Sequence, residues 1–263
     1  MSQIIINPQE YSENNHPQYH IVKQHLSLFD FRGDETILDI GCGDGKVTGL
    51  LTAYTNNTIC GIDRSAAMIA FANNYAQQNT MYNLKFLVAN AENFTLGPFD
   101  LITSFFCVHL IGNVFKMLQC IQYSMLANGC ALLLFPAENN YFSDIINELS
   151  QVQPWSQYFA ANNQTKQIAC KTHYEQAIAA NNLCIKAFNE QQFQYCFANQ
   201  ESFKNWLKTT LHSLKLIPNN LRNMYLTQAI TLYNQYINTN FGITTANTFI
   251  FNLYNIILSQ KNT

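Results

Sequence analysis

The sequence predicts an α/β fold with a mostly parallel sheet and crossover helices, and three observations support this prediction. Short apolar strands alternate with helical stretches from residue 36 onward, which is typical of a parallel sheet. A glycine-rich segment, GCGDG at residues 41–45, follows the first apolar strand directly. The 263 residues are 48% hydrophobic, so the chain is long enough and apolar enough for one large domain.

The first half of the chain has the clearest pattern. Helices are expected at 46–54, 65–77 and 112–126, and Ser65 is a suitable N-cap for the second of them. The last of these helices has apolar residues at helical spacing, namely Val114, Met117, Leu118, Ile121 and Met125. Strands are expected at 36–40, 58–63, 84–89, 99–104 and 130–135.

Beyond residue 138 the alternation is looser. Helices are expected near 141–158, 172–181, 200–213 and 219–238, and late strands at 183–197 and 246–257. With no internal repeat and no Pro/Gly/Ser linker, residues 1–263 are interpreted as a single domain. Its expected parts are a ligand-binding core at about 36–138, cap and substrate elements at about 1–32 and 139–240, and a last strand at about 246–257.

Charge and composition exclude several classes of partner. Fourteen basic residues against sixteen acidic ones give a formal charge of −2, which does not suit a protein that binds DNA or RNA. The N-terminus lacks a basic region followed by an apolar one, and nowhere do about 18 apolar residues run together, so no membrane insertion is expected.

The cysteines and histidines indicate neither a disulfide framework nor a metal site. The eight cysteines are scattered without paired metal-type spacing, which favours a reducing, cytoplasmic location. His16 and His20 have the i, i+4 spacing of helical metal ligands, but Pro17 lies between them and no third ligand is evident. No metal is therefore expected, and the sequence carries no signal for an oligomeric state.

The glycine-rich segment indicates a ligand that approaches the backbone closely. After a buried strand, G-x-G permits a tight turn, and two ligand classes use it: dinucleotides and S-adenosylmethionine. A dinucleotide fingerprint is G-x-G-x-x-G, whereas here the third glycine, Gly45, comes one residue early. Asp39 and Asp44 flank the turn, and their charge would repel a pyrophosphate but attract a sulfonium and an ammonium. The sequence therefore favours S-adenosylmethionine.

Two later strand ends supply further candidate contacts. Asp63, 22 residues after Gly41, is placed to accept both hydroxyls of an unphosphorylated ribose. Asn90 is placed to accept from an adenine amino group, with the backbone at Ala91 against the ring. Each feature alone also fits ordinary turn chemistry, since Asp63 by itself is a good N-cap. Together and in this order they favour a cofactor site.

The segments ILDIGCGDGKVT, GIDRSAAMIAFA and FDLITS resemble those of class I S-adenosylmethionine-dependent methyltransferases, over about residues 36–135. The resemblance implies a Rossmann-like seven-stranded sheet, mostly parallel with an antiparallel last strand, flanked by helices and with a helical cap over the carboxyl edge. It also implies S-adenosyl-L-methionine as cofactor and S-adenosyl-L-homocysteine as product. The residues expected to bind them are Asp39, Gly41, Cys42, Gly43, Asp63, Arg64, Met68, Asn90, Ala91, Glu92 and Ser104.

A narrower resemblance joins the chain to the juvenile hormone acid O-methyltransferases and the trans-aconitate methyltransferases. It is carried by ITSFFCVHLIGN at residues 102–113, by the segment at 137–159, and by YSENNHPQYH at 11–20. In that branch the N-terminal segment covers the cofactor and a glutamine contacts the substrate carboxylate, which implies that role for Gln18. The branch commonly has His-Trp after the fourth strand, whereas this chain has His109 and Leu110, so a wall of the acceptor pocket is changed.

A carboxylate acceptor fits these residues because it is already ionised at neutral pH and needs only donors to orient it. Gln18 and His109 are the candidate catalytic donors, although His109 is equally suited to a bond with neighbouring backbone. Trp155 either walls the acceptor pocket or packs the cap. The candidate pocket residues are Tyr11, Asn15, Phe105, Phe106, Leu110 and Trp155.

The resulting hypothesis is a methyltransferase that transfers a methyl group from S-adenosylmethionine to the carboxylate of a small acid. Three alternatives remain at this point. One is methylation of another small-molecule O, N or C acceptor, and another is a catalytically silent protein that binds S-adenosylmethionine. The third, a dehydrogenase, is disfavoured by the early third glycine and the flanking aspartates.

Overall fold

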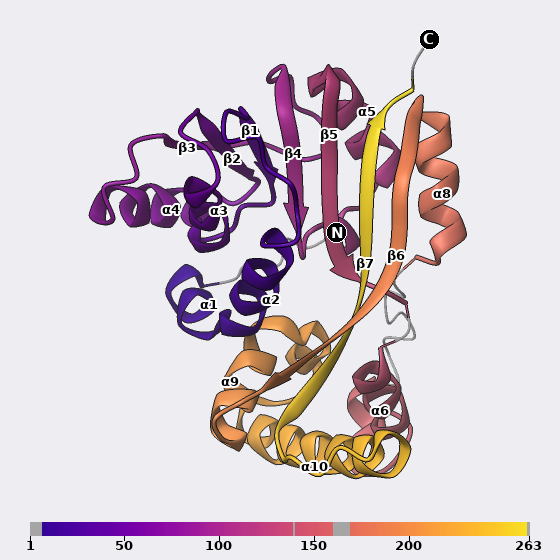
Figure 1. Cartoon of the computed structure of the whole chain (residues 1–263). Coiled ribbons are helices and arrows are strands. Elements are labelled where there is room, and N and C mark those ends of the chain that lie inside the picture. The colour runs from indigo at the N-terminus through magenta and orange to yellow at the C-terminus, as the bar shows by residue number, and fades with distance from the viewer. Residues whose placement is uncertain (1–6, 139, 160–168, 262–263) are drawn as a thin grey trace. The chain divides into compact units, whose positions relative to one another are not determined.

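A computed structural model describes residues 7–138, 140–159 and 169–261. Its strands form one seven-stranded sheet with the order β3-β2-β1-β4-β5-β7-β6 (Figure 1). Pairs β1·β2, β2·β3, β1·β4 and β4·β5 are parallel, and β5·β7 is antiparallel. This confirms the predicted fold class. The strands are β1 (Ile37–Ile40), β2 (Ile59–Asp63), β3 (Leu84–Val88), β4 (Phe99–Phe105), β5 (Met125–Pro136), β6 (Leu183–Cys196) and β7 (Thr248–Gln260).

The chain divides into two compact units. Among the described residues, the core unit comprises 7–137, 169–191 and 253–261, and the cap unit comprises 138, 140–159 and 192–252. From Asn7 onward, the N-terminal segment that we grouped with the cap belongs to the core unit. The predicted position of the cap over the carboxyl edge of the sheet stays a prediction.

The helices α4 (Ala66–Gln78) and α5 (Val114–Ser124) of the core unit each begin at a residue whose side chain caps them. Ser65 Oγ accepts from the Met68 backbone N–H at 3.3 Å, which confirms the expected N-cap. Asn113 Oδ1 caps the next long helix by accepting from Lys116 N at 3.1 Å. The helices are α1 (Pro8–Asn14), α2 (His16–Leu26), α3 (Lys46–Leu50), the 3₁₀ turn η1 (Leu51–Ala53), α4 (Ala66–Gln78), η2 (Val108–Leu110), α5 (Val114–Ser124) and α8 (Lys171–Ala180).

Two boundaries differ from the prediction for physical reasons. The helix expected at 46–54 is a short α-helix followed by a 3₁₀ turn. The strand expected at 130–135 begins at Met125, because Met125 pairs with Phe99 ahead of a register shift, after which Cys130 pairs with Leu101. The residues between the helix expected at 112–126 and this strand therefore form the irregular first part of β5.

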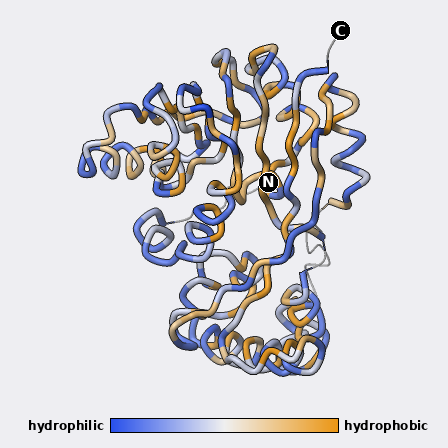
Figure 2. The backbone as a smooth tube through the Cα atoms, in the orientation of Figure 1, coloured by the Kyte–Doolittle hydropathy of each residue, from blue (hydrophilic) through white to orange (hydrophobic). Residues whose placement is uncertain are grey.

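The cap unit contains α6 (Tyr141–Leu149), α7 (Ser156–Phe159), α9 (Gln200–Thr210), η3 (His212–Leu216), η4 (Asn219–Leu221) and α10 (Arg222–Phe241). The single helix expected at 141–158 is broken, and Pro154, which has no backbone N–H and disfavours helical geometry before it, lies between α6 and α7. Along α10, apolar and polar stretches alternate (Figure 2), and its buried Tyr233 contacts the rings of Phe142 and Phe249. None of the described helices has an apolar stretch of membrane-spanning length.

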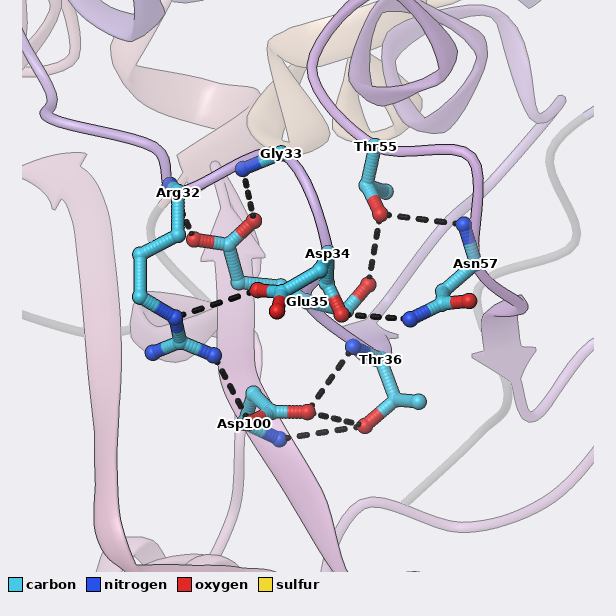
Figure 3. A network of polar contacts seen from close by, with 8 residues as sticks. All are labelled: Arg32, Gly33, Asp34, Glu35, Thr36, Thr55, Asn57 and Asp100. Atoms are coloured by element: carbon cyan, nitrogen blue, oxygen red, sulfur yellow. Dashed lines mark hydrogen bonds and ion pairs between the residues drawn. The ribbon is translucent and has the colours of Figure 1, made fainter.

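A polar network holds the amino ends of β1 and β4 together (Figure 3). Asp100 Oδ2 accepts from Thr36 N at 3.0 Å and from Thr36 Oγ1 at 2.7 Å, while Oδ1 accepts from Arg32 at 2.8 Å. The buried Glu35 accepts from the backbone N–H groups of Arg32 and Gly33. The network fixes the start of β1, and the opposite end of that strand carries the glycine-rich turn.

Candidate functional site

The candidate site is built on the turn after β1. Gly41 and Gly45 both have φ of +79°, in the left-handed region that favours glycine. A Cβ on Gly41 would lie 2.2 Å from Cys107 Sγ, and one on Gly45 would lie 2.8 Å from the Phe86 ring. At Gly43, where φ is +53°, an added Cβ would have only the Tyr11 ring near it, at 3.7 Å. The turn therefore requires glycine and leaves one side of its backbone accessible.

Asp39 lies at the base of this turn with 2% of its surface exposed. Its Oδ2 accepts from Thr48 Oγ1 at 2.5 Å and its Oδ1 from Thr103 Oγ1 at 2.9 Å. Burial raises the pKa of Asp39 to about 6, although both hydroxyls lower it, and the charge of Asp63 raises it further. Within the described part of the chain, Asp39 is thus a buried carboxylate whose two oxygens accept from neutral hydroxyl groups.

Asp63, at the end of β2, orders the turn from the other side. Its Oδ2 accepts from Gly43 N at 3.2 Å and its Oδ1 from Ser65 N at 2.8 Å. Burial raises the pKa of Asp63, and these two backbone donors oppose the shift. The carboxylate is therefore fixed beside the accessible backbone of Gly43, where we expected it to meet a ribose.

The N-terminal helices are attached to the same turn. Asn15 Nδ2 donates to Asp44 Oδ2 at 3.0 Å, and Lys46 Nζ donates to the Ser12 carbonyl at 2.6 Å. Burial raises the pKa of Tyr11, and the charges of Asp44 and nearby groups raise it further, so its phenol stays protonated at neutral pH. Sequence reasoning noted Asp44 as a charge beside the turn but did not identify it as the attachment point of α2.

A pocket joins predicted cofactor and substrate residues. Gln18, which is 6% exposed, lines it from α2, and Phe106 does so with a left-handed φ of +53°. For a bulky residue this φ is a strained conformation that commonly occurs at functional sites. Val47 was missed, although it closely follows the turn in the sequence. The complete lining is Tyr11, Gln18, Asp39, Gly41, Cys42, Gly43, Asp44, Val47, Phe105 and Phe106.

Most of the remaining predicted cofactor residues lie on the loop after β3 and around the start of α4. Ala89 N, just after β3, donates to the Asp63 carbonyl at 3.0 Å, which joins the loop to the end of β2. Asn90 Oδ1 accepts from Glu92 N at 3.0 Å, and Glu92 Oε1 accepts from the backbone N–H groups of residues 112 and 113 at 2.9 and 3.1 Å. The Glu92 carboxylate thus braces the start of α5. Ala91 and Met68 are buried and Arg64 is exposed.

Other predicted site residues lie away from the pocket lining. Ser104 Oγ donates to the Ile40 carbonyl at 2.9 Å and so ties β4 to β1. His109 is half-buried on η2, and Leu110 beside it is 39% exposed. Trp155 belongs to the cap unit, where its Nε1 donates to Gln228 at 2.8 Å and its ring meets Tyr225. The ligand roles of these residues stay predictions.

The charged side chains around the turn fit S-adenosylmethionine. Three carboxylates, those of Asp39, Asp44 and Asp63, lie around the turn, and a sulfonium with an ammonium complements their charge, whereas a pyrophosphate does not. Over the described ranges, no group of three His, Cys, Asp or Glu side chains is arranged to hold a metal.

Comparison with known proteins identifies the family. The family described as Methyltransferase domain matches residues 32–208. Protein 235L of Invertebrate iridescent virus 6, named as a methyltransferase, is 25% identical over 235 residues, which cover 88% of this chain and 86% of the relative. Juvenile hormone acid O-methyltransferase of Drosophila melanogaster is 28% identical over 165 residues, which cover 56% of this chain and 54% of the relative. The chain thus spans about half the length of that enzyme.

A solved structure agrees in fold. Geranyl diphosphate C-methyltransferase from Streptomyces coelicolor A3(2), in complex with Mg²⁺, geranyl diphosphate and S-adenosyl-L-homocysteine, superposes with a TM-score of 0.54 at 14% identity. The match covers 93% of this chain and 78% of that one. The match over residues 32–208 shows that the chain belongs to the methyltransferase domain family, and the solved structure shares its Rossmann-like fold. The chain is therefore an S-adenosylmethionine-dependent methyltransferase of the Rossmann-like class.

Proposed function

We propose that this enzyme transfers the methyl group to the carboxylate of a small, partly apolar acid. The observation that carries the proposal is the chemistry of the pocket, which combines a buried amide, Gln18, with the two aromatic residues Phe105 and Phe106. An amide is a donor that orients a carboxylate, and the rings suit an apolar body. The similarity to juvenile hormone acid O-methyltransferase supports the same class of acceptor.

Three titratable groups at or beside the pocket, those of Tyr11, Cys107 and Asp39, also favour an acceptor that needs no base. Burial raises the pKa values of Tyr11 and Cys107, the latter to about 12, so both stay protonated at neutral pH. Both carboxylate oxygens of Asp39 already accept hydrogen bonds from hydroxyl groups. A carboxylate is ionised at neutral pH without assistance, whereas a phenol or an ammonium must first lose a proton.

In this proposal the chain's own residues bind and orient the reactants. The bound cofactor supplies a methyl carbon activated by a positive sulfur. Asp63 accepts the ribose hydroxyls, the segment at Asn90 and Ala91 borders the adenine, and Gln18 and His109 donate to the acceptor. Orientation of this kind supplies effective molarities of about 10⁵ to 10⁸ M, which is the main contribution that such a transfer needs.

Incubation with S-adenosylmethionine and a library of small carboxylic acids tests the proposal, with methyl esters detected by mass spectrometry. Gln18→Ala should lower kcat/KM about 10- to 150-fold, as expected when a hydrogen bond to a charged group is lost. Gln24→Ala is the matched control, because Gln24 is an exposed glutamine on the same helix. Full turnover by Gln18→Ala contradicts the carboxylate model. Methylated products that resist base hydrolysis would instead indicate another O, N or C acceptor. Binding of S-adenosylmethionine without turnover of any acceptor would indicate a catalytically silent protein.

The predicted location is the cytoplasm, and the partner is a small acid rather than a nucleic acid. All eight cysteines are free, which supports a reducing compartment. Subcellular fractionation tests the location, and an electrophoretic shift assay with RNA and DNA tests the partner.

A further inference from the structure

Asp39 has an unusual environment for a carboxylate that is 2% exposed. Its two oxygens accept from Thr48 Oγ1 on α3 and Thr103 Oγ1 on β4, and no ion pair recorded in the described part of the chain includes it. A buried charge is costly unless a positive group compensates it. The two hydroxyls stabilise the anion but bring no positive charge.

The groups that face Asp39 from the neighbouring elements do not supply that charge either. They are Asp63 and Cys60 on β2, Cys42 in the turn, and Cys107 after β4. The nearest lysine in sequence, Lys46, donates its Nζ to the Ser12 carbonyl instead. Among the described residues, the interactions of Asp39 therefore include no positive group, and a cationic ligand bound at the turn is able to supply one.

The two ligands of a methyltransferase differ in this respect. S-adenosylmethionine carries a positive sulfur, and S-adenosylhomocysteine carries a neutral thioether. We propose that Thr48 and Thr103 are specificity-determining positioning residues, which keep Asp39 ionised under the glycine turn so that the site prefers the charged cofactor over the neutral product. This inference rests on the proposed cofactor placement. It makes methyl transfer the event that removes this attraction and so weakens the binding of the product relative to that of the cofactor.

The preference should depend on pH in a defined direction. The pKa of Asp39 is raised to about 6, so the carboxylate is neutral well below that pH and ionised above it. The ratio of the two affinities, cofactor over product, should therefore rise about three- to tenfold between pH 5 and pH 8, as a solvent-attenuated charge pair predicts. The ammonium and carboxylate that both ligands share cancel in this ratio.

Calorimetric titration with S-adenosylmethionine and with S-adenosylhomocysteine at several pH values tests the inference. Thr48→Val and Thr103→Val each remove one hydroxyl, so the midpoint of the ratio should move to higher pH. Thr52→Val is the matched control, because the Thr52 hydroxyl donates to the Gly49 carbonyl and not to Asp39. Because Asp44 and Asp63 also have raised pKa values, the shift in the threonine variants is what assigns the titration to Asp39.

The possible results separate the two proposals. A ratio that does not change with pH in the native chain, or a midpoint that is the same in Thr48→Val, Thr103→Val and Thr52→Val, overturns the role of the hydroxyls while the proposed function stands. Failure of the native chain to bind either ligand at any pH overturns the cofactor placement itself. Asp39→Asn adds a test that does not depend on the threonine variants: its ratio should be low and independent of pH.

Discussion

Replacing Asp39 with asparagine should stabilise the ligand-free protein at alkaline pH, although it removes a charge from the cofactor site. The folded protein raises the pKa of Asp39 from 3.8 to about 6, so the ionised form is disfavoured by roughly 3 kcal/mol once the pH exceeds both values. Asparagine has the same shape without the charge, and its amide is able to bond to Thr48 and Thr103, because hydroxyls both donate and accept.

The sign of the pH dependence follows from the raised pKa. Between pH 3.8 and 6 the folded state binds more protons than the unfolded state, so the contribution of Asp39 to stability falls as pH rises through this window. About half of the penalty is already present at pH 5 and all of it at pH 8. The advantage of Asp39→Asn should therefore grow by about 1 kcal/mol between these two pH values.

Urea unfolding of both proteins at pH 5 and pH 8 measures this difference. Asp30→Asn is the matched control, because Asp30 is an exposed aspartate outside the turn, on the segment between α2 and β1. An equal effect of Asp39→Asn on the free energy of unfolding at pH 5 and pH 8 would refute this reasoning. A variant that is less stable at pH 8 than at pH 5, relative to the native chain, would refute it equally.

Three further outcomes are expected. Asp63→Ala should weaken S-adenosylmethionine binding at least about 100-fold in calorimetry, because a charged hydrogen-bond acceptor and the brace on Gly43 are lost together; unchanged affinity would remove Asp63 from the site. Burial lowers the pKa of His25, so the unfolded state is protonated first and stability should fall as pH drops below about 6.5; His25→Gln should flatten this slope in urea unfolding between pH 7.5 and 5.5. Lys46→Met should speed hydrogen exchange in α1, because its bond to the Ser12 carbonyl is lost, and equal exchange would mean that this bond does not hold the helix.

The features that sequence reasoning predicted are those that depend on neighbouring residues. The glycines of the turn and the Ser65 cap act within a few positions of each other, so their pattern is visible in the chain. The support of Asp39 was not predicted, because Thr103 lies 64 residues away and only the pairing of β1 with β4 brings it close. The early start of β5 was missed for the same reason, since its pairing with Phe99 is a long-range contact.

Two predicted cofactor residues illustrate a second limit of a motif. Ser104 and Glu92 were assigned from the resemblance to class I methyltransferases, and the structure shows their side-chain atoms bonded to backbone groups of β1 and of the segment before α5. A motif indicates which loop lies at a site, whereas the direction of each side chain depends on the nearest unsatisfied backbone group. Positions that brace a loop therefore resemble ligand contacts in the sequence.

The amino ends of β1 and β4 stabilise the fold, whereas their carboxyl ends carry the candidate site. At the amino ends, Asp100 accepts bonds from Thr36 and Arg32, and these groups are mutually satisfied (Figure 3). At the carboxyl ends lie a strained Phe106 and the buried Asp39, both of which cost stability in the free protein. Because one end holds the strands in register, the other end is able to keep an unfavourable arrangement that a cationic ligand then stabilises. A variant that relieves the carboxyl end should accordingly gain stability and lose affinity, whereas one that weakens the amino end should lose both.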